Sequence, residues 1–334
     1  MRAAFIRQHG GSEVIEVGEQ PTPTPGEGQV QVRVHAAALN RLDLYTRAGL
    51  RGTQVPAEKM PHVLGGDCAG EVSALGKGVT GLRAGQRVVV NPLLSNVPYP
   101  NMVGTHAPGS DAEYVVVPAA NAVPIPDALS YEQAAALPTV YLPTWSIIMR
   151  EGQMRTGETA LVLSASSGVG TAAIQIVKGV VGGRCIAVTS TPEKIAAAKA
   201  LGADETINYK TESLAERVKE LTGGKGVDLV VDSTGALFFE DAYASLARGG
   251  RYGICGVTSG YKANLHLGQL FTKELRIFGV FMGTNRELGQ IVEAAGAGKV
   301  ASAIHRNVGL EGLAEAHAEM ERSEHFGKFV VTID

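Results

Sequence analysis

The pattern of apolar and polar positions changes near residue 124. Beyond it, short apolar runs alternate with segments of helical length, and six of the runs predict strands: 159–164, 185–190, 205–208, 228–233, 251–255 and 275–280. Helices fit between the early strands at 170–180, 192–201 and 212–221. Alternating strands and helices are typical of βαβ units. The pattern therefore predicts an α/β fold with a doubly wound, six-stranded parallel sheet.

The first third of the chain has a different pattern, with β-branched runs such as 29–39 and 84–92 lying between Pro and Gly clusters. Such punctuation is typical of a β domain. After residue 280 the chain predicts two helices, at 287–295 and 310–322, and a closing strand, without a βαβ rhythm. We therefore expect residues 1–124 and 281–334 to form one domain, and residues 125–280 to form the other.

The turn after the first strand of the α/β domain reads SASSGVG (164–170) and leads directly into a predicted helix. A helix N-terminus next to glycines presents backbone N–H groups to an anion. The turn departs from the motif G-x-G-x-x-G, so a glycine-rich turn with only a packing role is the alternative. Its position after the first strand of the βαβ series nevertheless predicts a site for the phosphates of a dinucleotide. The candidate cofactor-binding residues in this turn are Ser166, Ser167, Gly168, Val169 and Gly170.

The end of the second strand indicates which dinucleotide binds. An acid there would bind the adenosine ribose, but the chain reads AVTSTPEK, and Glu193 falls inside the following helix. Ser190 offers a hydroxyl and Lys194 a positive charge, which favours NADP(H) over NAD(H). Alternatively, Lys194 is a solvated helix residue and Ser190 caps the helix that starts at Pro192.

Composition narrows the class of partner. The 334 residues are 45% hydrophobic and carry a net charge of −3, which provides no basic field for nucleic acid or for a charged membrane surface. The apolar runs are too short for a membrane span, and the first residues do not resemble a secretory signal. We expect a cytoplasmic protein with a small-molecule partner and neither nucleic-acid nor membrane partners. The three cysteines lie too far apart in sequence for a Cys-rich zinc site.

Longer motifs extend over nearly the whole chain: AAALNRLDLYTRAG (36–49), PHVLGGDCAGEV (61–72), ALGADETINYK (200–210), LTGGKGVDLVVDSTG (221–235) and the terminal FGKFVV. In these motifs the chain resembles the medium-chain dehydrogenase/reductase superfamily, and within it the zinc-independent quinone oxidoreductases related to zeta-crystallin. The resemblance implies a GroES-like catalytic domain (1–124 and 281–334), a Rossmann dinucleotide-binding domain (125–280), and a nicotinamide bound in the cleft between them.

The resemblance also implies roles for single residues. Asn40 and Tyr45, about one helical turn apart, would face the nicotinamide and substrate as the catalytic residues. Tyr209 and Lys194 would lie near the adenosine phosphate, and Gly235 would contact the cofactor. A homodimer or homotetramer is implied through an edge strand, for which LRIFGV (275–280) is the candidate.

Two positions concern zinc. The zinc-dependent alcohol dehydrogenases of the superfamily carry Cys where this chain has Asn40 and His where it has Gly66, and a catalytic zinc needs three good donors. The cysteines of a structural zinc lobe are also missing from residues 91–114. We expect no bound metal, with an improvised site at His62 and Cys68 as the alternative. For the aspartates nearby, Asp43 and Asp67, we favour structural hydrogen bonding.

Without a Lewis acid, hydride transfer to an isolated ketone is disfavoured, whereas a conjugated carbonyl spreads charge and needs only modest hydrogen-bond donors. We therefore expect an NADPH-dependent quinone or enone oxidoreductase. One alternative is a zinc-dependent alcohol dehydrogenase with atypical ligands, and another is a catalytically weak, NADPH-binding structural or RNA-associated protein. Thr139, Tyr141 and Thr144 either line the pocket or form a buried helix face.

Overall fold

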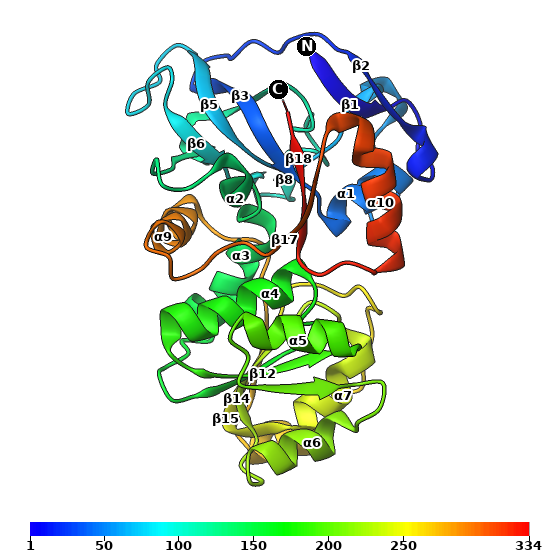
Figure 1. The fold of residues 1–334 in the computed structure, drawn as a ribbon, viewed down its shortest axis with the longest axis vertical. Coiled ribbons are helices and arrows are strands. Elements are labelled where there is room, and N and C mark those ends of the chain that lie inside the picture. The colour runs from blue at the N-terminus through cyan, green and yellow to red at the C-terminus, as the bar shows by residue number, and fades with distance from the viewer. Residues whose placement is uncertain (334) are drawn as a thin grey trace. The chain divides into compact units, whose positions relative to one another are not determined.

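The computed structural model describes residues 1–333, which form two compact units (Figure 1). Unit 1 comprises Met1–Thr139, Thr284–Gly296 and the chain from Ile304 onward, and unit 2 comprises Val140–Gly283 and Ala297–Ala303. Most of the C-terminal chain thus belongs with the N-terminal β region. The exception, 297–303, packs in unit 2, where the Ala301 N–H donates to the Gln175 side chain at 2.7 Å. Residues 125–139 lie in unit 1, so the first boundary between the two units falls after Thr139 and not at the expected residue 125.

Unit 1 contains mainly antiparallel sheets, the largest of them built around the long strand β3 (Gln29–Ala38), and in that sheet β17 and β18 pair in parallel. Its largest sheet has the order β10-β6-β5-β3-β18-β17, with β9 also paired to β3. The other strands of this sheet are β5 (Asp67–Leu75), β6 (Arg87–Val90), β9 (Tyr114–Pro118), β10 (Ala122–Pro124), β17 (Ile304–Val308) and β18 (Lys328–Thr332). Strands β1 (Arg2–Ile6), β2 (Ile15–Glu19) and β4 (His62–Val63) form a second sheet, and β7 (Leu93–Ser95) pairs with β8 (Asn101–Met102).

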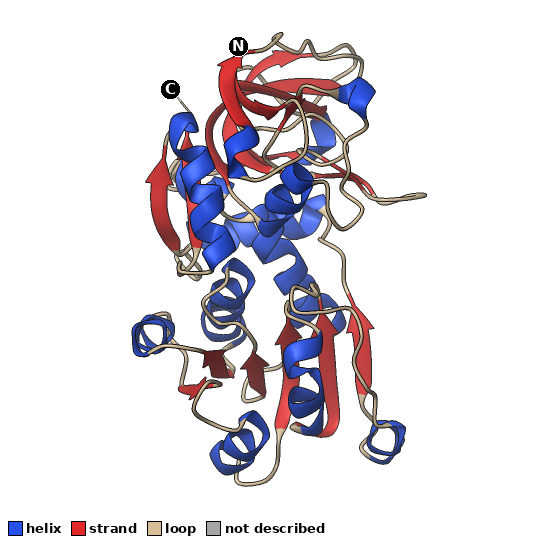
Figure 2. Ribbon diagram, turned by 90° about the vertical axis from the view of Figure 1, so that its right-hand side faces the viewer, coloured by secondary structure: helices blue, strands red, loops and turns tan. Residues whose placement is uncertain are grey.

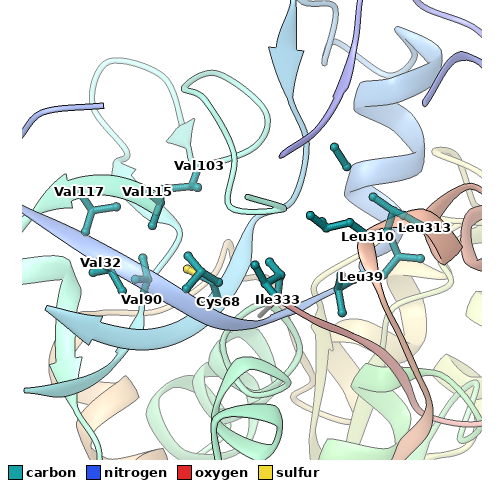
Figure 3. Close-up of a cluster of buried hydrophobic side chains, with 14 of the residues drawn as sticks. Val32, Leu39, Cys68, Val90, Val103, Val115, Val117, Leu310, Leu313 and Ile333 are labelled. Carbon is teal, nitrogen blue, oxygen red and sulfur yellow. The ribbon is translucent and has the colours of Figure 1, made fainter. Parts of the chain in front are cut away.

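The core of unit 1 follows from the alternation along β3. Val30, Val32 and Val34 are buried, whereas Gln31 between them is partly exposed and Arg33 is exposed, because successive side chains of a strand point to opposite faces. Figure 3 shows Val32 in the cluster with side chains from other strands and with Leu313. Each such side chain contributes about 1.5–3 kcal/mol on burial, so this cluster fixes the strand register.

Unit 1 also contains helices. They are α1 (Arg41–Ala48), α2 (Tyr131–Ala135), α9 (Asn285–Gly296), α10 (Leu313–Arg322) and the start of α3 (Pro138–Trp145). The predicted helices at 287–295 and 310–322 correspond to α9 and to α10 with the turn before it. The short strand β17 was not predicted, because its alternating polar sequence, IHRNV, has few apolar positions.

Unit 2 contains the predicted sheet of six parallel strands, in the order β13-β12-β11-β14-β15-β16. The strands are β11 (Thr159–Val162), β12 (Arg184–Thr189), β13 (Glu205–Asn208), β14 (Val227–Asp232), β15 (Leu246–Ile254) and β16 (Arg276–Gly279). Helices α4 (Gly168–Gln175) and α5 (Pro192–Ala200) are drawn above strands β12, β14 and β15 in Figure 1, and Figure 2 shows the helices of this unit around its strands. The strand order reverses beside β11, which is where doubly wound sheets bind ligands.

The remaining helices of unit 2 are α6 (Leu214–Leu221), α7 (Ala236–Ala244) and α8 (Leu267–Thr272). Neither α7 nor α8 was predicted. The predicted helix 170–180 is divided into α4 and a π-helical segment, η5 (Ile176–Val181), and a second π-helical segment, η4 (Ser146–Glu151), precedes β11. At Gly179 the chain passes so close to Lys299 that a Cβ would lie 1.9 Å from its carbonyl oxygen. Within residues 1–333, no helix has the length and apolar character needed to cross a bilayer.

Candidate functional site

The turn after β11 brings a helix N-terminus to the carboxyl end of the central strand. Ser167 is the N-cap of α4, and its hydroxyl accepts a hydrogen bond from the Gly170 N–H at 3.0 Å. Its carbonyl oxygen accepts from the Thr171 N–H at 2.8 Å. These bonds fix the first turn of α4 while Ser166, Gly168 and Val169 stay partly exposed. The arrangement presents the N-terminal end of the helix to an anion.

Gly170 is needed here for space. A Cβ at this position would lie 2.2 Å from the Ser164 carbonyl oxygen and 2.6 Å from the Cα of Ala165. Ser164 itself has a φ of 52°, an uncommon value for a residue other than glycine. The turn thus folds back tightly on α4 although it lacks the first glycine of the usual dinucleotide motif.

The next strand, β12, ends at Thr189 without an acidic residue. The hydroxyl of Thr191 caps α5 by accepting from the Lys194 N–H at 3.3 Å. Ser190 as the helix cap was therefore the wrong alternative: α5 starts at Pro192, so the N-cap is the residue immediately before it. Ser190 and Lys194 are both half-buried, and Glu193 lies inside α5 as expected.

The strands on either side complete one edge of the sheet. Beyond β13, Tyr209 is partly exposed and packs edge-on against Phe238, with ring centroids 5.0 Å apart. Beyond β14, Gly235 adopts a φ of 81°, and its N–H donates to Asp232 at 3.1 Å. Asp232 is buried and also accepts from the Tyr252 hydroxyl at 2.9 Å.

Strand register brings these segments together. Ala165 N–H donates to the Val188 carbonyl, and Tyr209 N–H donates to the Thr189 carbonyl, at 2.9 and 3.1 Å. Because all four strands run in parallel, their carboxyl ends meet at the same edge. The structure thus places the turn 164–170, Ser190 with Lys194, Tyr209 and Gly235 along one edge of unit 2. The exposed helix N-terminus, hydroxyls and positive charge along this edge fit the chemistry of a dinucleotide.

Unit 1 contains a second polar cluster, buried around Asn40. Asn40 precedes α1 and is 6% exposed, and its amide nitrogen donates to Asp67 at 2.9 Å and to the Ala38 carbonyl at 3.2 Å. Its amide oxygen accepts from the ammonium of Lys328, at the start of β18, at 2.5 Å. Every hydrogen-bonding atom of the Asn40 side chain is thereby used within unit 1.

Asp67, at the start of β5, accepts from four groups. Besides Asn40, these are the N–H and the hydroxyl of Thr139, the latter at 2.7 Å, and the ammonium of Lys328 at 3.5 Å. Lys328 also donates to the Leu39 carbonyl at 2.9 Å. Burial lowers the pKa of Lys328, whereas the Asp67 and Asp43 carboxylates act to raise it. Three acceptors therefore surround an ammonium that has three N–H donors.

Two further buried aspartates lie near this cluster. Asp43 accepts from the Asn40 N–H at 2.7 Å, and burial, with a smaller contribution from Asp67, raises its pKa to about 7. Burial also raises the pKa of Asp111 well above its ordinary value. Hydrogen bonding at Asp43 and Asp67 matches the structural role favoured for them from the sequence.

A zinc ion does not fit the donors around Asp67. Gly66 has no side chain, the Asn40 amide already binds Lys328 and Asp67, and the ammonium of Lys328 would repel a divalent cation. His62 binds the Gly104 carbonyl through Nε2 at 3.0 Å. Cys68 is buried, which raises the pKa of its thiol to about 12. Across residues 1–333 no group of three or more His, Cys, Asp or Glu side chains is arranged to hold a metal ion.

The other candidates divide between surface and interior. Tyr45 is half-buried on α1, and the Arg51 guanidinium lies over its ring at 4.6 Å. Tyr141 and Thr144 are buried, and Thr144 donates to the Val140 carbonyl at 2.6 Å. They therefore form a buried helix face, whereas Thr139 binds Asp67.

Comparisons with known proteins agree with this architecture. Residues 26–127 match the alcohol dehydrogenase GroES-like domain, and residues 168–297 match the zinc-binding dehydrogenase family. A quinone oxidoreductase of Pseudomonas aeruginosa is 32% identical over 97% of both chains. The chain belongs to the medium-chain dehydrogenase/reductase superfamily. The superfamily and the fold class predicted from the sequence, including the GroES-like domain, are confirmed.

Solved structures of this superfamily resemble the chain along its full length. An NAD-dependent alcohol dehydrogenase has 42% identity and a TM-score of 0.93, with all of both chains covered. A quinone oxidoreductase of Pseudomonas syringae pv. tomato has 32% identity and a TM-score of 0.85, with 99% of both chains covered. This medium-chain dehydrogenase/reductase is therefore an oxidoreductase that uses a nicotinamide cofactor and a small-molecule substrate.

Sequence reasoning missed Lys328 as part of the Asn40 cluster. Its signal in the sequence is a single lysine at the start of an otherwise apolar strand, KFVVT. A charged side chain in such a place is buried only when it is paired. The pattern therefore indicates an internal partner but does not identify it.

Proposed function

We propose that this medium-chain dehydrogenase/reductase is an NADPH-dependent reductase that transfers hydride to a quinone or another conjugated carbonyl without a metal. The observation that carries the proposal is the donor set around Asp67, where Asn40, Gly66 and Lys328 do not suit zinc. A conjugated acceptor takes hydride at a remote carbon and spreads the negative charge onto oxygen. Such a substrate reacts without a Lewis acid, and water can supply the proton.

The preference for NADPH rests on the end of β12. No carboxylate stands there to bind the ribose hydroxyls, and Ser190 and Lys194 offer a hydroxyl and a positive charge for a 2′-phosphate. We assign Ser166, Ser167, Gly168, Val169 and Gly170 to the diphosphate, and Tyr209 and Gly235 to the same cofactor. Of the two residues expected to be catalytic, Asn40 has its donors used internally and acts as a positioning residue, whereas the Tyr45 hydroxyl is the candidate donor to substrate.

The second candidate is an NAD-dependent alcohol dehydrogenase. It is favoured by the full-length similarity to a solved structure of that name. This activity on an isolated alcohol or ketone requires a strong electrophile at the substrate oxygen, which in zinc enzymes is the metal. Metal content and cofactor choice therefore separate the two candidates.

We also propose a homo-oligomer that forms through unit 2. Strand β16 is an edge strand of its sheet, and Leu267, Phe271 and Phe281 nearby in the sequence are 66%, 75% and 49% exposed. An exposed edge with apolar neighbours favours pairing with a second copy. Light scattering at low micromolar concentration tests this, and a monomer would contradict it.

The deciding experiment starts with metal analysis of the purified protein. The protein is then titrated with NADPH and NADH side by side, and cofactor oxidation is followed with 9,10-phenanthrenequinone, an enone and a simple ketone. We expect tighter NADPH binding, turnover with the conjugated acceptors, and no stoichiometric zinc. Stoichiometric zinc with ketone turnover would favour the alcohol dehydrogenase, and tight NADPH binding without turnover on any acceptor would indicate a binding protein.

A further inference from the structure

The buried ammonium of Lys328 contacts Asn40, which stands where the zinc-dependent alcohol dehydrogenases carry a cysteine ligand. Lys328 is 3% exposed, Asp67 is fully buried, and Asn40 is 6% exposed. The ammonium contacts the Asn40 amide oxygen and the Asp67 carboxylate at 2.5 and 3.5 Å. The side-chain nitrogen of Lys328 is thus built into the cluster from a strand near the C-terminus.

Stability alone does not account for this lysine. A buried ion pair gains little net free energy, because the desolvation of both charges offsets their attraction, and apolar replacements are often neutral or stabilising. The cluster nevertheless orients a specific group. With its oxygen toward Lys328 and its nitrogen toward Asp67, the Asn40 amide is held in one of its two possible flips.

We propose that Lys328 replaces a divalent metal in this protein: its ammonium fixes the Asn40 amide and the Asp67 carboxylate, and it excludes a metal ion from the same position. Lys328 is a positioning residue, because it acts on the reaction through Asn40 and Asp67. The effect of Lys328 on the reaction rests on the proposed reductase function. The exclusion of a metal ion by Lys328 does not depend on that function. The two parts can therefore be tested separately.

The metal-binding test first introduces metal-ligating side chains near Asp67 and then removes the positive charge of Lys328. In the double variant Asn40→Cys/Gly66→His, a thiol replaces the amide that contacts Asp67, and an imidazole is added at the neighbouring position in the chain. A Cβ at Gly66 would have the Val103 carbonyl oxygen as its nearest neighbour, at 3.4 Å, so the backbone there leaves room for a Cβ. The triple variant adds Lys328→Met. Each protein is titrated with Co²⁺, whose visible absorption reports tetrahedral thiolate coordination, and metal analysis after dialysis gives the stoichiometry.

We expect the triple variant to bind one Co²⁺ per chain, the double variant to bind at least about tenfold more weakly because of charge repulsion, and the wild-type protein to show no cobalt bands. Equal affinity in the double and triple variants would overturn the proposal, as would stoichiometric metal binding by the wild type in competition with Lys328. Stoichiometric cobalt binding by the wild type would overturn the proposal even if a variant does not fold.

The kinetic test compares Lys328→Met with Lys328→Arg. We expect the methionine variant to lose about tenfold or more in kcat, with the KM for NADPH changed less than about threefold, and we expect arginine to recover part of the loss. Lys273→Met is the matched control, because Lys273 donates only to backbone carbonyls, those of Ala244 and Leu246. Far-UV circular dichroism and urea unfolding check that each variant is folded.

An unchanged kcat in folded Lys328→Met would overturn the positioning role. A wild-type protein that reduces no quinone or enone would instead refute the proposed function, and the cobalt titrations would still decide whether Lys328 stands in for a metal.

Discussion

The side chains of Lys328 and Asn40 are hydrogen-bonded although 288 positions separate them in the sequence. The bond joins the start of β18 to the residue before α1, and Asp67 contacts both of its partners. The network thus ties the start of α1, the start of β5 and the start of β18 to one another. Its polar groups are satisfied by one another in the interior, so that each depends on the others being present.

Asn40→Asp tests this mutual dependence. The change places a carboxylate oxygen where the amide nitrogen now donates to Asp67 at 2.9 Å. We expect the free energy of unfolding to fall by about 3 kcal/mol at pH 8 and by less at pH 5. The neighbouring carboxylate raises the folded-state pKa of the introduced group, so folding is favoured where that group is protonated and is weakened as the pH rises.

Urea unfolding at both pH values, each referred to the wild type, measures the effect. Asn40→Ser is the control, because it removes the amide without adding a charge and should lose the same amount at both pH values. If Asn40→Asp behaved like the serine variant, Asn40 would not face Asp67.

Ser167→Ala tests the cap of the phosphate turn. The Ser167 hydroxyl accepts from the Gly170 N–H, and loss of such a cap costs about 1 kcal/mol. We expect the dissociation constants of NADPH and NADH to rise by a similar factor, because both cofactors share the diphosphate. Ser213→Ala is the control, since Ser213 precedes α6 without a capping hydrogen bond from its side chain. A change confined to NADPH would be inconsistent with a diphosphate site.

Much of unit 2 could be predicted because its strands are continuous apolar runs and its phosphate turn follows directly on the first of them. Rules that use only neighbouring residues were less accurate for the ends of helices and for short helices. Ser190 and Thr191 both suit a helix cap, and only the backbone shows that Thr191 provides it. The short helix α8 has only six residues and no buried side chain, so its apolar positions are too few to show a helical period.

The Asn40 cluster was harder to predict for a different reason. The motif around Asn40 and Asp67 was visible by resemblance, but Lys328 and Thr139 join them only through the sheet register and the start of α3. The periodicity of apolar residues along the chain gives no information on contacts between residues so far apart in the sequence. The burial of Asp43, which raises its pKa to about 7, likewise follows from packing and cannot be predicted from the local sequence.

Lys194→Ala tests the cofactor preference. If Lys194 contacts the 2′-phosphate, its loss removes a charged hydrogen bond, and the KM for NADPH should rise about tenfold. The KM for NADH should change less than about twofold, because NADH has no phosphate there. Lys199→Ala, near the other end of the same helix, serves as the control and should change neither. Equal changes for both cofactors would contradict the assignment of Lys194.

Tyr45→Phe removes only the hydroxyl and leaves the ring beneath the Arg51 guanidinium. If this hydroxyl supports the charge that develops on the substrate oxygen, kcat for a quinone should fall about tenfold. Binding of NADPH and the far-UV spectrum should stay the same. Tyr99→Phe, on an 80% exposed side chain, is the control. An unchanged rate would leave Tyr45 with only its ring contact to Arg51.

His317 makes stability depend on pH. It is fully buried on α10, and burial together with the nearby Arg47 guanidinium lowers its pKa from 6.5 to about 3. Between these values the unfolded chain binds a proton that the folded protein does not. The contribution to stability is therefore complete above pH 6.5 and is lost at about 1.4 kcal/mol per pH unit as the pH falls.

Asp43 opposes this trend, because its pKa is raised in the folded protein and protonation below about pH 7 favours folding. The effect of His317 must therefore be measured as a difference between wild type and His317→Gln, which keeps an acceptor for Arg47. Urea unfolding from pH 7.5 to 4.5 should show the stability of the wild type relative to the variant falling by about 1.4 kcal/mol per unit below pH 6.5. Constant m-values would show that both proteins unfold to the same extent, and a difference independent of pH would mean that the pKa of His317 is the same in the folded and unfolded chain.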